Sequence, residues 1–315
     1  MEHSTAVCVI GPGRAGTSMT MRALNLLGVH VGPEEGLVEP GPGGPKGFWE
    51  QRDIIELNDR LLRSQGGSWR NPPRLAPGWE RAAELDGERE QARALLDEAF
   101  AGHDAWGWKD PRVSLTAAFW QAIVPDLRYV ICLRNPIDVA DSISPPADRK
   151  REEAFYYARR GPTRERAYRL WSTYVASALA NTAGRPRIFV SYEDHFDERH
   201  ATLERLAGFV GREPPPPGGE TDRLIEDFVD ADLRHYSTAP ADVAGDDRLP
   251  ADVTSLYLIS ELLKEALRRP RERDGAGGGD ALETSADLYA RRLLDADQEE
   301  RSTGGDAARS PSVSG

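Results

Sequence analysis

Apolar residues occur along the chain in short continuous runs, separated by longer segments of mixed polarity. A continuous apolar run of four to six residues is typical of a strand that is buried on both faces of a parallel sheet. The sequence predicts such strands over residues 6–10, 105–108, 128–133 and 187–191.

In the segments between these runs, apolar positions recur three and four residues apart, which predicts helices. Ile54, Leu57 and Leu61, for example, share one face of the helix predicted over 52–63. The other predicted helices cover residues 18–27, 88–101, 163–181, 198–210 and 251–268. Strands that alternate with helices predict an α/β fold of three layers, a central parallel sheet with helices on both faces. Such folds bind ligands at the carboxyl ends of the strands.

Two stretches depart from this alternation. Residues 32–47, GPEEGLVEPGPGGPKG, contain so much Gly and Pro that they predict a long loop, of the kind that often forms a lid. From residue 271 the chain becomes rich in Gly, Asp and Ser, which is typical of disordered segments. We therefore predict one domain over residues 1–270 and a disordered tail over 271–315, in which DLYARRLL favours one or two transient helical turns.

Composition and charge narrow the classes of function. The chain has 315 residues, 39% of them hydrophobic, which is enough for one large core. Its net charge of −12 argues against nucleic acid as a partner, so an anionic ligand would need a local cationic pocket. We expect no integral membrane segment, because no apolar run approaches the about 20 residues of a membrane span. Cys8 and Cys132 lie in apolar runs typical of buried thiols, which favours a cytoplasmic protein.

The segment AVCVIGPGRAGTSMTMRAL, residues 6–24, has the layout of a phosphate-binding loop between a strand and a helix. Gly11 and Gly16 have the spacing of the nucleoside triphosphatase pattern, but Thr17 stands where that pattern has Lys. The nearby cation is Arg14, inside the loop. Backbone N–H groups and the positive helix end attract a phosphate whatever the rest of the ligand. The alternative is a tight turn in which the glycines only relieve steric conflict.

Another motif, LRNPIDVADS, follows the predicted strand over 128–133. Arg134 comes directly after this strand, and Pro136 is placed to begin a helix that carries Ser142. An arginine offers a forked, charged contact to a phosphate, and a serine hydroxyl can complete its hydrogen bonding. We interpret Arg134 and Ser142 as a second anion site, although a surface cation and an ordinary helix residue are the alternative.

Two further strands also end in polar residues. Lys109 and Arg112 in WKDPR place two cations at the sheet edge that holds the loop, unless Asp110 takes them up in salt bridges. Tyr192 in SYED ends the last strand, where its ring could stack on an aromatic base or pack in the core.

The motifs GPGRAGTS, LRNPIDVADS and SYED together resemble those of the sulfotransferases that use 3'-phosphoadenosine 5'-phosphosulfate (PAPS), and KDPR resembles their bacterial and glycan-acting members. The resemblance covers roughly residues 5–270. It implies a P-loop-like sulfotransferase fold in which the loop cradles the 5'-phosphosulfate, and a donor that needs no metal. It also implies a set of donor-binding residues, in which Arg134 and Ser142 hold the 3'-phosphate: Gly13, Arg14, Ala15, Gly16, Thr17, Ser18, Arg134, Ser142 and Tyr192.

The catalytic residues follow from the same resemblance. Hormone-sulfating members carry a Lys-x-His whose His removes the proton of the acceptor, whereas Lys109 is followed here by Asp110 and Pro111. In related bacterial members a Glu does this work, and PKGFWEQRDI offers Glu50. The resemblance thus implies Glu50 as the base, and Asp110 is the reserve candidate. Because charge grows on the leaving oxygen during transfer, we assign the cations Arg14 and Lys109 to that oxygen. A Glu at a helix start is otherwise a partner of the helix dipole.

The implied reaction is transfer of a sulfuryl group to a hydroxyl of a small-molecule, glycan or glycolipid acceptor. Five tryptophans fall where this family builds acceptor pockets, with core packing as the alternative: Trp49, Trp69, Trp79, Trp106 and Trp108. An ATP-dependent small-molecule kinase and a non-catalytic nucleotide-binding protein remain alternatives. The missing Lys weighs against the kinase and Glu50 against the non-catalytic protein. The abundance of Arg, Ala and Gly suggests a bacterial, GC-rich source.

Overall fold

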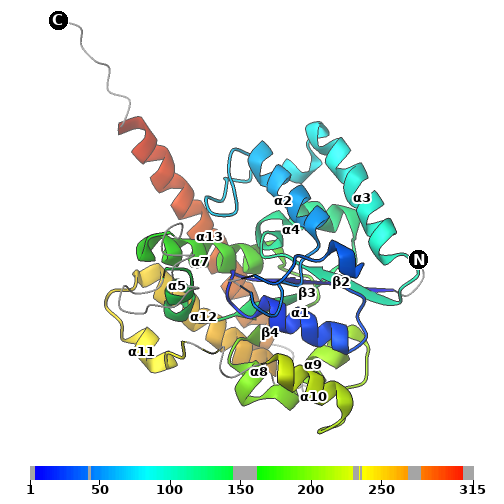
Figure 1. The fold of residues 1–315 in the computed structure, drawn as a ribbon. Helices are drawn as coiled ribbons and strands as arrows, with labels where there is room; N and C mark the ends of the chain where they lie inside the picture. The colour runs from blue at the N-terminus through cyan, green and yellow to red at the C-terminus, as the bar shows by residue number, and fades with distance from the viewer. Residues whose placement is uncertain are drawn as a thin grey trace, which may run out of the picture.

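The centre of the protein is a four-stranded parallel sheet (Figure 1). The structure is a computed structural model and describes residues 4–41, 44–144, 162–229, 234, 236–268 and 278–307. The strand order is β2-β1-β3-β4, where the strands are β1 (Thr5–Ile10), β2 (Ala105–Lys109), β3 (Arg128–Leu133) and β4 (Arg187–Ser191). The predicted parallel sheet is confirmed, and each predicted strand agrees with the observed one to within one residue at either end.

Helices cover both faces of this sheet, because successive side chains point to opposite sides. Along β1, Ala6, Cys8 and Ile10 enter one core cluster, and Val7 and Val9 enter another. The first cluster is completed by α2 (Arg52–Ser64), α3 (Asp86–Phe100), α4 (Val113–Ile123), α5 (Pro136–Ile143), α7 (Arg164–Asn181) and α12 (Ala251–Arg268). The second is completed by α1 (Thr17–Leu26), α9 (Arg199–Val210) and α10 (Glu220–Phe228). The predicted three-layer α/β architecture is therefore confirmed, and burial on both faces explains the continuous apolar runs.

The shorter elements and the unpredicted helices complete the fold. The short elements are α8 (Asp194–Asp197), α11 (Pro240–Ala244) and 3-10 turns at Glu34–Gly36, Trp79–Arg81 and Ala83–Leu85. Helix α5 begins at Pro136, as predicted. Helix α4 had no signal in the sequence, because its segment VSLTAAFWQAI is apolar on nearly all sides and has no amphipathic period. None of the helices in the described ranges is both long and apolar enough to cross a membrane.

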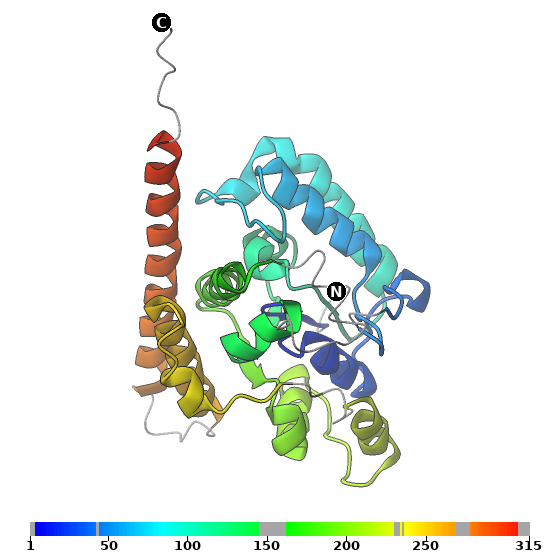
Figure 2. The same cartoon turned by 60° about the vertical axis from the view of Figure 1, so that its left-hand side comes forward.

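Residues 278–307 differ from the disordered tail that composition predicted over 271–315; the rest of that tail lies outside the described residues. Residues Gly278–Ala307 form α13, which packs along α7 and α12 (Figure 2). Ala286 and Ala290 are buried in the first core cluster. The buried Arg187 at the start of β4 donates to both carboxylate oxygens of Asp287 at 2.9 Å and to Glu283 at 3.1 Å. A few residues on one face therefore attach this otherwise polar helix to the core. Average composition does not reveal them, because they are few.

The strand order creates a crevice between β1 and β3. The chain leaves β1 for β2 at one edge of the sheet and later leaves β3 for β4 at the other edge. Such a switch point is where open α/β sheets hold their ligands. The glycine-rich loop after β1 and the segment after β3 both leave the sheet there, so the fold brings these two motifs together.

Candidate active site

The glycine-rich loop after β1 has two glycines that the fold itself requires. Gly11 has φ 130°, and a β-carbon placed on it would lie 2.3 Å from the carbonyl oxygen of Cys132. Gly16 has φ 85° and faces the ring of Tyr192. A β-carbon on Gly13, by contrast, would meet no atom within 4 Å. The steric alternative thus accounts for Gly11 and Gly16, while Gly13 borders open space.

The start of α1 offers an anion its unpaired N–H groups. Among the described residues no side chain caps this helix end, and its first turn contains no acidic residue. The positive end of the helix dipole is therefore not neutralised locally. The N–H of Ala15 is directed inward, to the oxygen of Pro12 at 3.3 Å. The hydroxyl of Ser18 donates to the oxygen of Phe48 at 3.0 Å, which ties the helix start to the segment that carries Glu50.

A cavity of about 540 Å³ lies over these elements. Its wall comes from the loop after β1, the ends of β2, β3 and β4, the segment before α2, and α7. The predicted site residues that line it are Gly13, Arg14, Gly16, Thr17, Ser18, Glu50, Lys109, Arg134, Ser142 and Tyr192. Ala15 is the predicted residue that does not. The fold thus gathers residues from five separate segments into one cavity.

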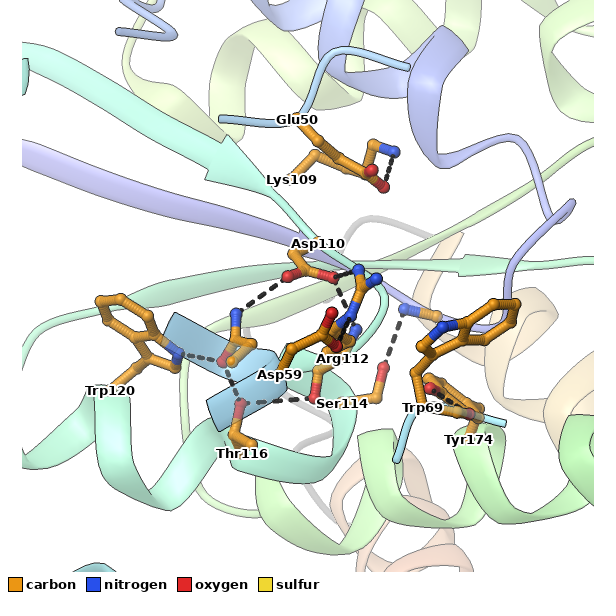
Figure 3. A network of polar contacts seen from close by, with 12 residues as sticks. Glu50, Asp59, Trp69, Lys109, Asp110, Arg112, Ser114, Thr116, Trp120 and Tyr174 are labelled. Carbon is orange, nitrogen blue, oxygen red and sulfur yellow. Dashed lines mark hydrogen bonds and ion pairs between the residues drawn. The ribbon is translucent and has the colours of Figure 1, made fainter. Parts of the chain in front are cut away.

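Glu50 and Lys109 form an ion pair inside this cavity (Figure 3). The Lys109 Nζ lies 2.5 Å from Glu50 Oε1, and the two side chains are 2% and 13% exposed. Burial raises the pKa of the Glu50 carboxyl above its ordinary value, and the Lys109 ammonium opposes that rise. Glu50 lies two residues before α2, and the acidic residue in the first turn of that helix is Asp53. The role of helix-dipole partner therefore suits Asp53 rather than Glu50. The carboxylate is therefore engaged with Lys109 beside the cavity.

Arg14, Ser142 and Arg134 meet across the switch point. Arg14 adopts the left-handed conformation, with φ 71°, and its Nε donates to Ser142 Oγ at 2.8 Å. Arg134 Nη1 donates to the backbone oxygen of Arg14 at 3.2 Å, and its Nη2 to the oxygen of Tyr236 at 2.9 Å. Its Nε is buried and has no hydrogen-bond partner among the described residues. A buried donor without a partner is costly, and this Nε belongs to a residue that lines the cavity.

Arg134 also occupies one face of Tyr192. The centre of its guanidinium lies 3.8 Å from the centroid of the tyrosine ring. Burial lowers the pKa of Arg134, and the neighbouring Tyr192 and Asp138 oppose this change. The ring of Tyr192 therefore orients the arginine, in addition to any contact that its remaining surface makes with a ligand.

Asp110 belongs to a buried network next to the cavity rather than to its wall. Its carboxylate accepts hydrogen bonds from Arg112 Nη1 at 3.0 Å, from the Arg112 N–H at 2.9 Å and from Asn58 Nδ2 at 2.9 Å. Arg112 also donates to Asp59 at 2.7 Å. Figure 3 shows this network separate from the pair of Glu50 and Lys109. The salt-bridge alternative is therefore right for Arg112.

The tryptophans divide between the core and the cavity. Trp79, Trp106 and Trp108 are buried in the first core cluster, as the packing alternative expected. Trp49 lies under the Arg22 guanidinium and makes an edge-to-face contact with Phe228. Trp69, which is 38% exposed, lines the cavity.

Sequence reasoning missed several aromatic residues of the cavity wall, among them two on α7. Trp171 and Tyr174 lie three residues apart on α7, a spacing that is also typical of core residues, so no sequence signal distinguishes them from the core. Trp171 Nε1 donates to the backbone oxygen of Arg134 at 2.9 Å, and the Tyr174 hydroxyl donates to that of Trp69 at 2.9 Å. Helix α7 thus holds both sides of the cavity.

Comparisons with known proteins agree with the motifs. A model described as the sulfotransferase family matches residues 6–216. The structure is similar to the sulfotransferase domain of the olefin synthase of Synechococcus PCC 7002, with 18% identity, a TM-score of 0.41 and coverage of 86% of this chain and 98% of that one. It is also similar to the sulfotransferases STF9 of Mycobacterium avium (12% identity, 76% and 70% coverage, TM-score 0.40) and STF1 of Mycobacterium tuberculosis H37Rv (13%, 75% and 74%, 0.40). A search of curated protein sequences finds no match. Because the family model matches well over half of the chain, the protein belongs to the sulfotransferase family.

Proposed function

We propose that the protein transfers the sulfuryl group of PAPS to a hydroxyl of a small-molecule or carbohydrate acceptor, glycolipids included. Membership of the sulfotransferase family supports sulfuryl transfer. The observation that carries the rest is the buried Glu50–Lys109 pair, which lies in the same cavity as the uncapped start of α1 and the unpartnered Nε of Arg134. One cavity thus offers two places for anions and a carboxylate for a hydroxyl.

The residues present fit the donor. The open space at Gly13 and the N–H groups at the start of α1 suit its 5'-phosphosulfate. Arg134 Nε and the hydroxyl proton of Ser142, whose oxygen accepts from Arg14, suit its 3'-phosphate. When bound, the donor supplies the sulfuryl group. Thr17 in place of a P-loop Lys is consistent with a ligand that has no γ-phosphate.

Glu50 is the better candidate for the base that removes the acceptor proton. It lines the cavity, and its pKa is raised by burial, which improves a carboxylate as a proton acceptor. Among the described residues, the hydrogen bonds of Asp110 lie within the structural network, so Asp110 drops to a secondary candidate. Once Glu50 has taken the proton, it attracts Lys109 less strongly. The ammonium, together with Arg14, is then available to the charge that develops on the leaving oxygen.

The test is to incubate the protein with PAPS and a panel of alcohols, phenols and monosaccharides in the presence of a chelator, and to detect adenosine 3',5'-bisphosphate (PAP) and sulfated products by mass spectrometry. Thermal unfolding should show stabilisation by PAP that exceeds that by ATP with magnesium. If ATP with magnesium stabilises the protein more than PAP and chelator abolishes all transfer, the kinase replaces this proposal.

We also propose that this reaction takes place in the cytoplasm. Cys8 and Cys132 are free and buried, and they belong to core clusters on opposite faces of the sheet, so they cannot bridge each other. Burial raises the pKa of Cys8 and brings that of Cys132 to about 12, which keeps both thiols protonated and unreactive. This pattern supports a reducing compartment.

A further inference from the structure

A second hollow, of about 370 Å³, adjoins the active-site cavity. The segment after Trp69 and the first turns of α7 form its wall. Arg70 and Leu170 line both hollows, so the two meet at these residues. The side chains of Arg166 and Arg169 line the second hollow, and neither lines the first. The second hollow therefore extends the cavity away from the residues that we assign to the donor.

Three arginines converge on this hollow for identifiable reasons. Arg166 and Arg169 are three residues apart on α7 and share one face of the helix. Arg70 is brought to them by its neighbour Trp69, whose backbone oxygen accepts from the Tyr174 hydroxyl at 2.9 Å and whose ring lies 4.7 Å below the Arg70 guanidinium. Arg166 also donates to the backbone oxygen of Arg70 at 3.5 Å. These contacts hold the segment after Trp69 against the first turns of α7 without a ligand.

The charge of this hollow is opposite to that of the chain. In the part of the chain that the structure describes, its charged lining residues are Arg70, Arg166, Arg169 and Glu165, of which Glu165 pairs with Arg169 at 2.7 Å. A local excess of positive charge on a chain of net charge −12 attracts anions to this place. The guanidinium fork suits the oxygens of phosphate, sulfate and carboxylate groups.

We propose that Arg70, Arg166 and Arg169 form an arginine subsite that binds an anionic group of the acceptor while the acceptor hydroxyl lies beside Glu50. The inference rests on the proposed function and names its substrate class. The acceptor is an elongated hydroxyl compound with a phosphate, sulfate or carboxylate at its far end. Its middle part passes Trp69 and Leu170 on the cavity wall, which suits an apolar chain or ring.

The test compares matched probes that differ in the far group alone: ω-hydroxyalkyl phosphates, ω-hydroxy carboxylates and neutral ω-diols of increasing chain length, each with PAPS. At one chain length or more, kcat/KM for an anionic probe should exceed that of the diol by about tenfold at low ionic strength, and added salt should reduce this ratio. A larger ratio for the phosphate than for the carboxylate would identify the group.

The double variant Arg166→Gln, Arg169→Gln should lower that ratio by about fivefold or more, because each exposed ion pair contributes modestly. Glu165→Gln should raise the ratio, since the carboxylate repels the anion. Arg93→Gln, on the exposed face of α3, is the control and should keep the ratio of the unchanged protein. Equal kcat/KM for anionic and neutral probes at all lengths, or an unchanged ratio in the double variant, would overturn the subsite.

A binding measurement separates this inference from the proposed function. Calorimetric titration of the PAP-saturated protein with the ω-hydroxyalkyl phosphates should give an affinity that falls about fivefold in the double variant. Transfer to the diols without a preference for anionic probes would refute the subsite and leave the proposed function intact. Absence of all transfer would count against the proposed function. In that case the calorimetric titration, done without PAP if PAP does not bind, still tests the subsite. A loss of affinity in the double variant supports the subsite, and an unchanged affinity refutes it.

Discussion

Lys109 Nζ and Glu50 Oε1 lie 2.5 Å apart at the carboxyl end of β2, and both side chains are almost completely buried. A buried ion pair contributes little net stability, because removing both charges from water costs about as much as their attraction returns. The pair therefore has its best explanation in chemistry. Burial raises the pKa of the Glu50 carboxyl and the Lys109 ammonium opposes that rise, and this balance supports the role of general base that we propose for Glu50.

The first prediction concerns Glu50→Gln. The amide keeps the shape of the side chain but cannot accept the hydroxyl proton, so kcat should fall by roughly 100- to 10,000-fold. The affinity for PAP, measured by calorimetry, should change little, because Glu50 does not belong to the proposed donor contacts. The matched control is Glu80→Gln. Glu80 is also buried and ion-paired, with a side chain 12% exposed and Arg81 at 3.3 Å, but it lies outside the cavity.

Near-normal turnover in Glu50→Gln would contradict this role. If Asp110→Asn in a folded protein abolished turnover at the same time, the base would be Asp110. The unfolding free energy of Asp110→Asn must be measured together with its turnover, because this substitution also removes the charge that Arg112 contacts.

The second prediction concerns the pH dependence of Lys109→Gln. The Lys109 ammonium lowers the pKa of Glu50 against the effect of burial, so its removal should raise that pKa further. A base works as the carboxylate, and the acid limb of kcat/KM should therefore move to higher pH. Turnover at neutral pH should fall roughly 100-fold, because the cation that we assign to the leaving oxygen is lost as well. Lys264→Gln, which removes another buried lysine paired at 2.5 Å, is the control. An acid limb at the same pH in Lys109→Gln would show that Glu50 is not the titrating base.

The third prediction concerns Arg134→Ala. Charged hydrogen bonds contribute about 1.5–3 kcal/mol each, so the loss of Arg134 should weaken PAP binding by about tenfold or more. The loss should be smaller for a nucleotide without a 3'-phosphate. Arg128→Ala is the control, because Arg128 lies at the opposite end of β3 and donates to Phe209. Equal PAP affinity in the Arg134 variant and the unchanged protein, measured by calorimetry, would remove Arg134 from the donor site.

The fourth prediction separates two glycines of one loop. Gly13→Ala should leave the unfolding free energy within about 1 kcal/mol, because the added methyl meets no protein atom, but it should weaken PAP binding about tenfold or more. Gly11→Ala should lower the unfolding free energy by about 2 kcal/mol or more, since its β-carbon would lie 2.3 Å from the Cys132 oxygen. Urea unfolding and PAP titration of both variants check this. Full PAP affinity in Gly13→Ala would show that the donor lies elsewhere.

The fifth prediction concerns stability in acid. Burial lowers the pKa of His195 from 6.5 to about 4, and its Nε2 lies 2.8 Å from Thr20 Oγ1. The unfolded chain therefore binds a proton that the folded protein excludes, so this contribution to stability is complete above pH 6.5 and is lost as the pH falls toward 4. From pH 7 to pH 5 the loss from His195 should be about 2 kcal/mol. His195→Gln should show a correspondingly weaker pH dependence of urea unfolding. An identical dependence in His195→Gln would contradict the assignment.

The sheet and much of the cavity wall were predictable from the sequence. Its apolar runs located all four strands, because a strand buried on both faces must be apolar at successive positions. The residues that follow these strands, among them Arg14, Lys109 and Arg134, were predictable as neighbours because parallel strands end at one edge. The family followed from the same motifs, and the family model confirms it.

Tertiary structure alone decided how these residues pair. Nothing in the spacing of Glu50 and Lys109 showed that they meet, because their contact depends on how the segment before α2 folds back over β2. The same holds for the separation of Asp110 from the cavity, for the division of the tryptophans, and for the docking of α13 through Arg187. A local sequence pattern shows which face of its own strand or helix a residue occupies. Contacts between distant segments depend on packing over the whole chain, and there a few buried polar atoms outweigh average composition.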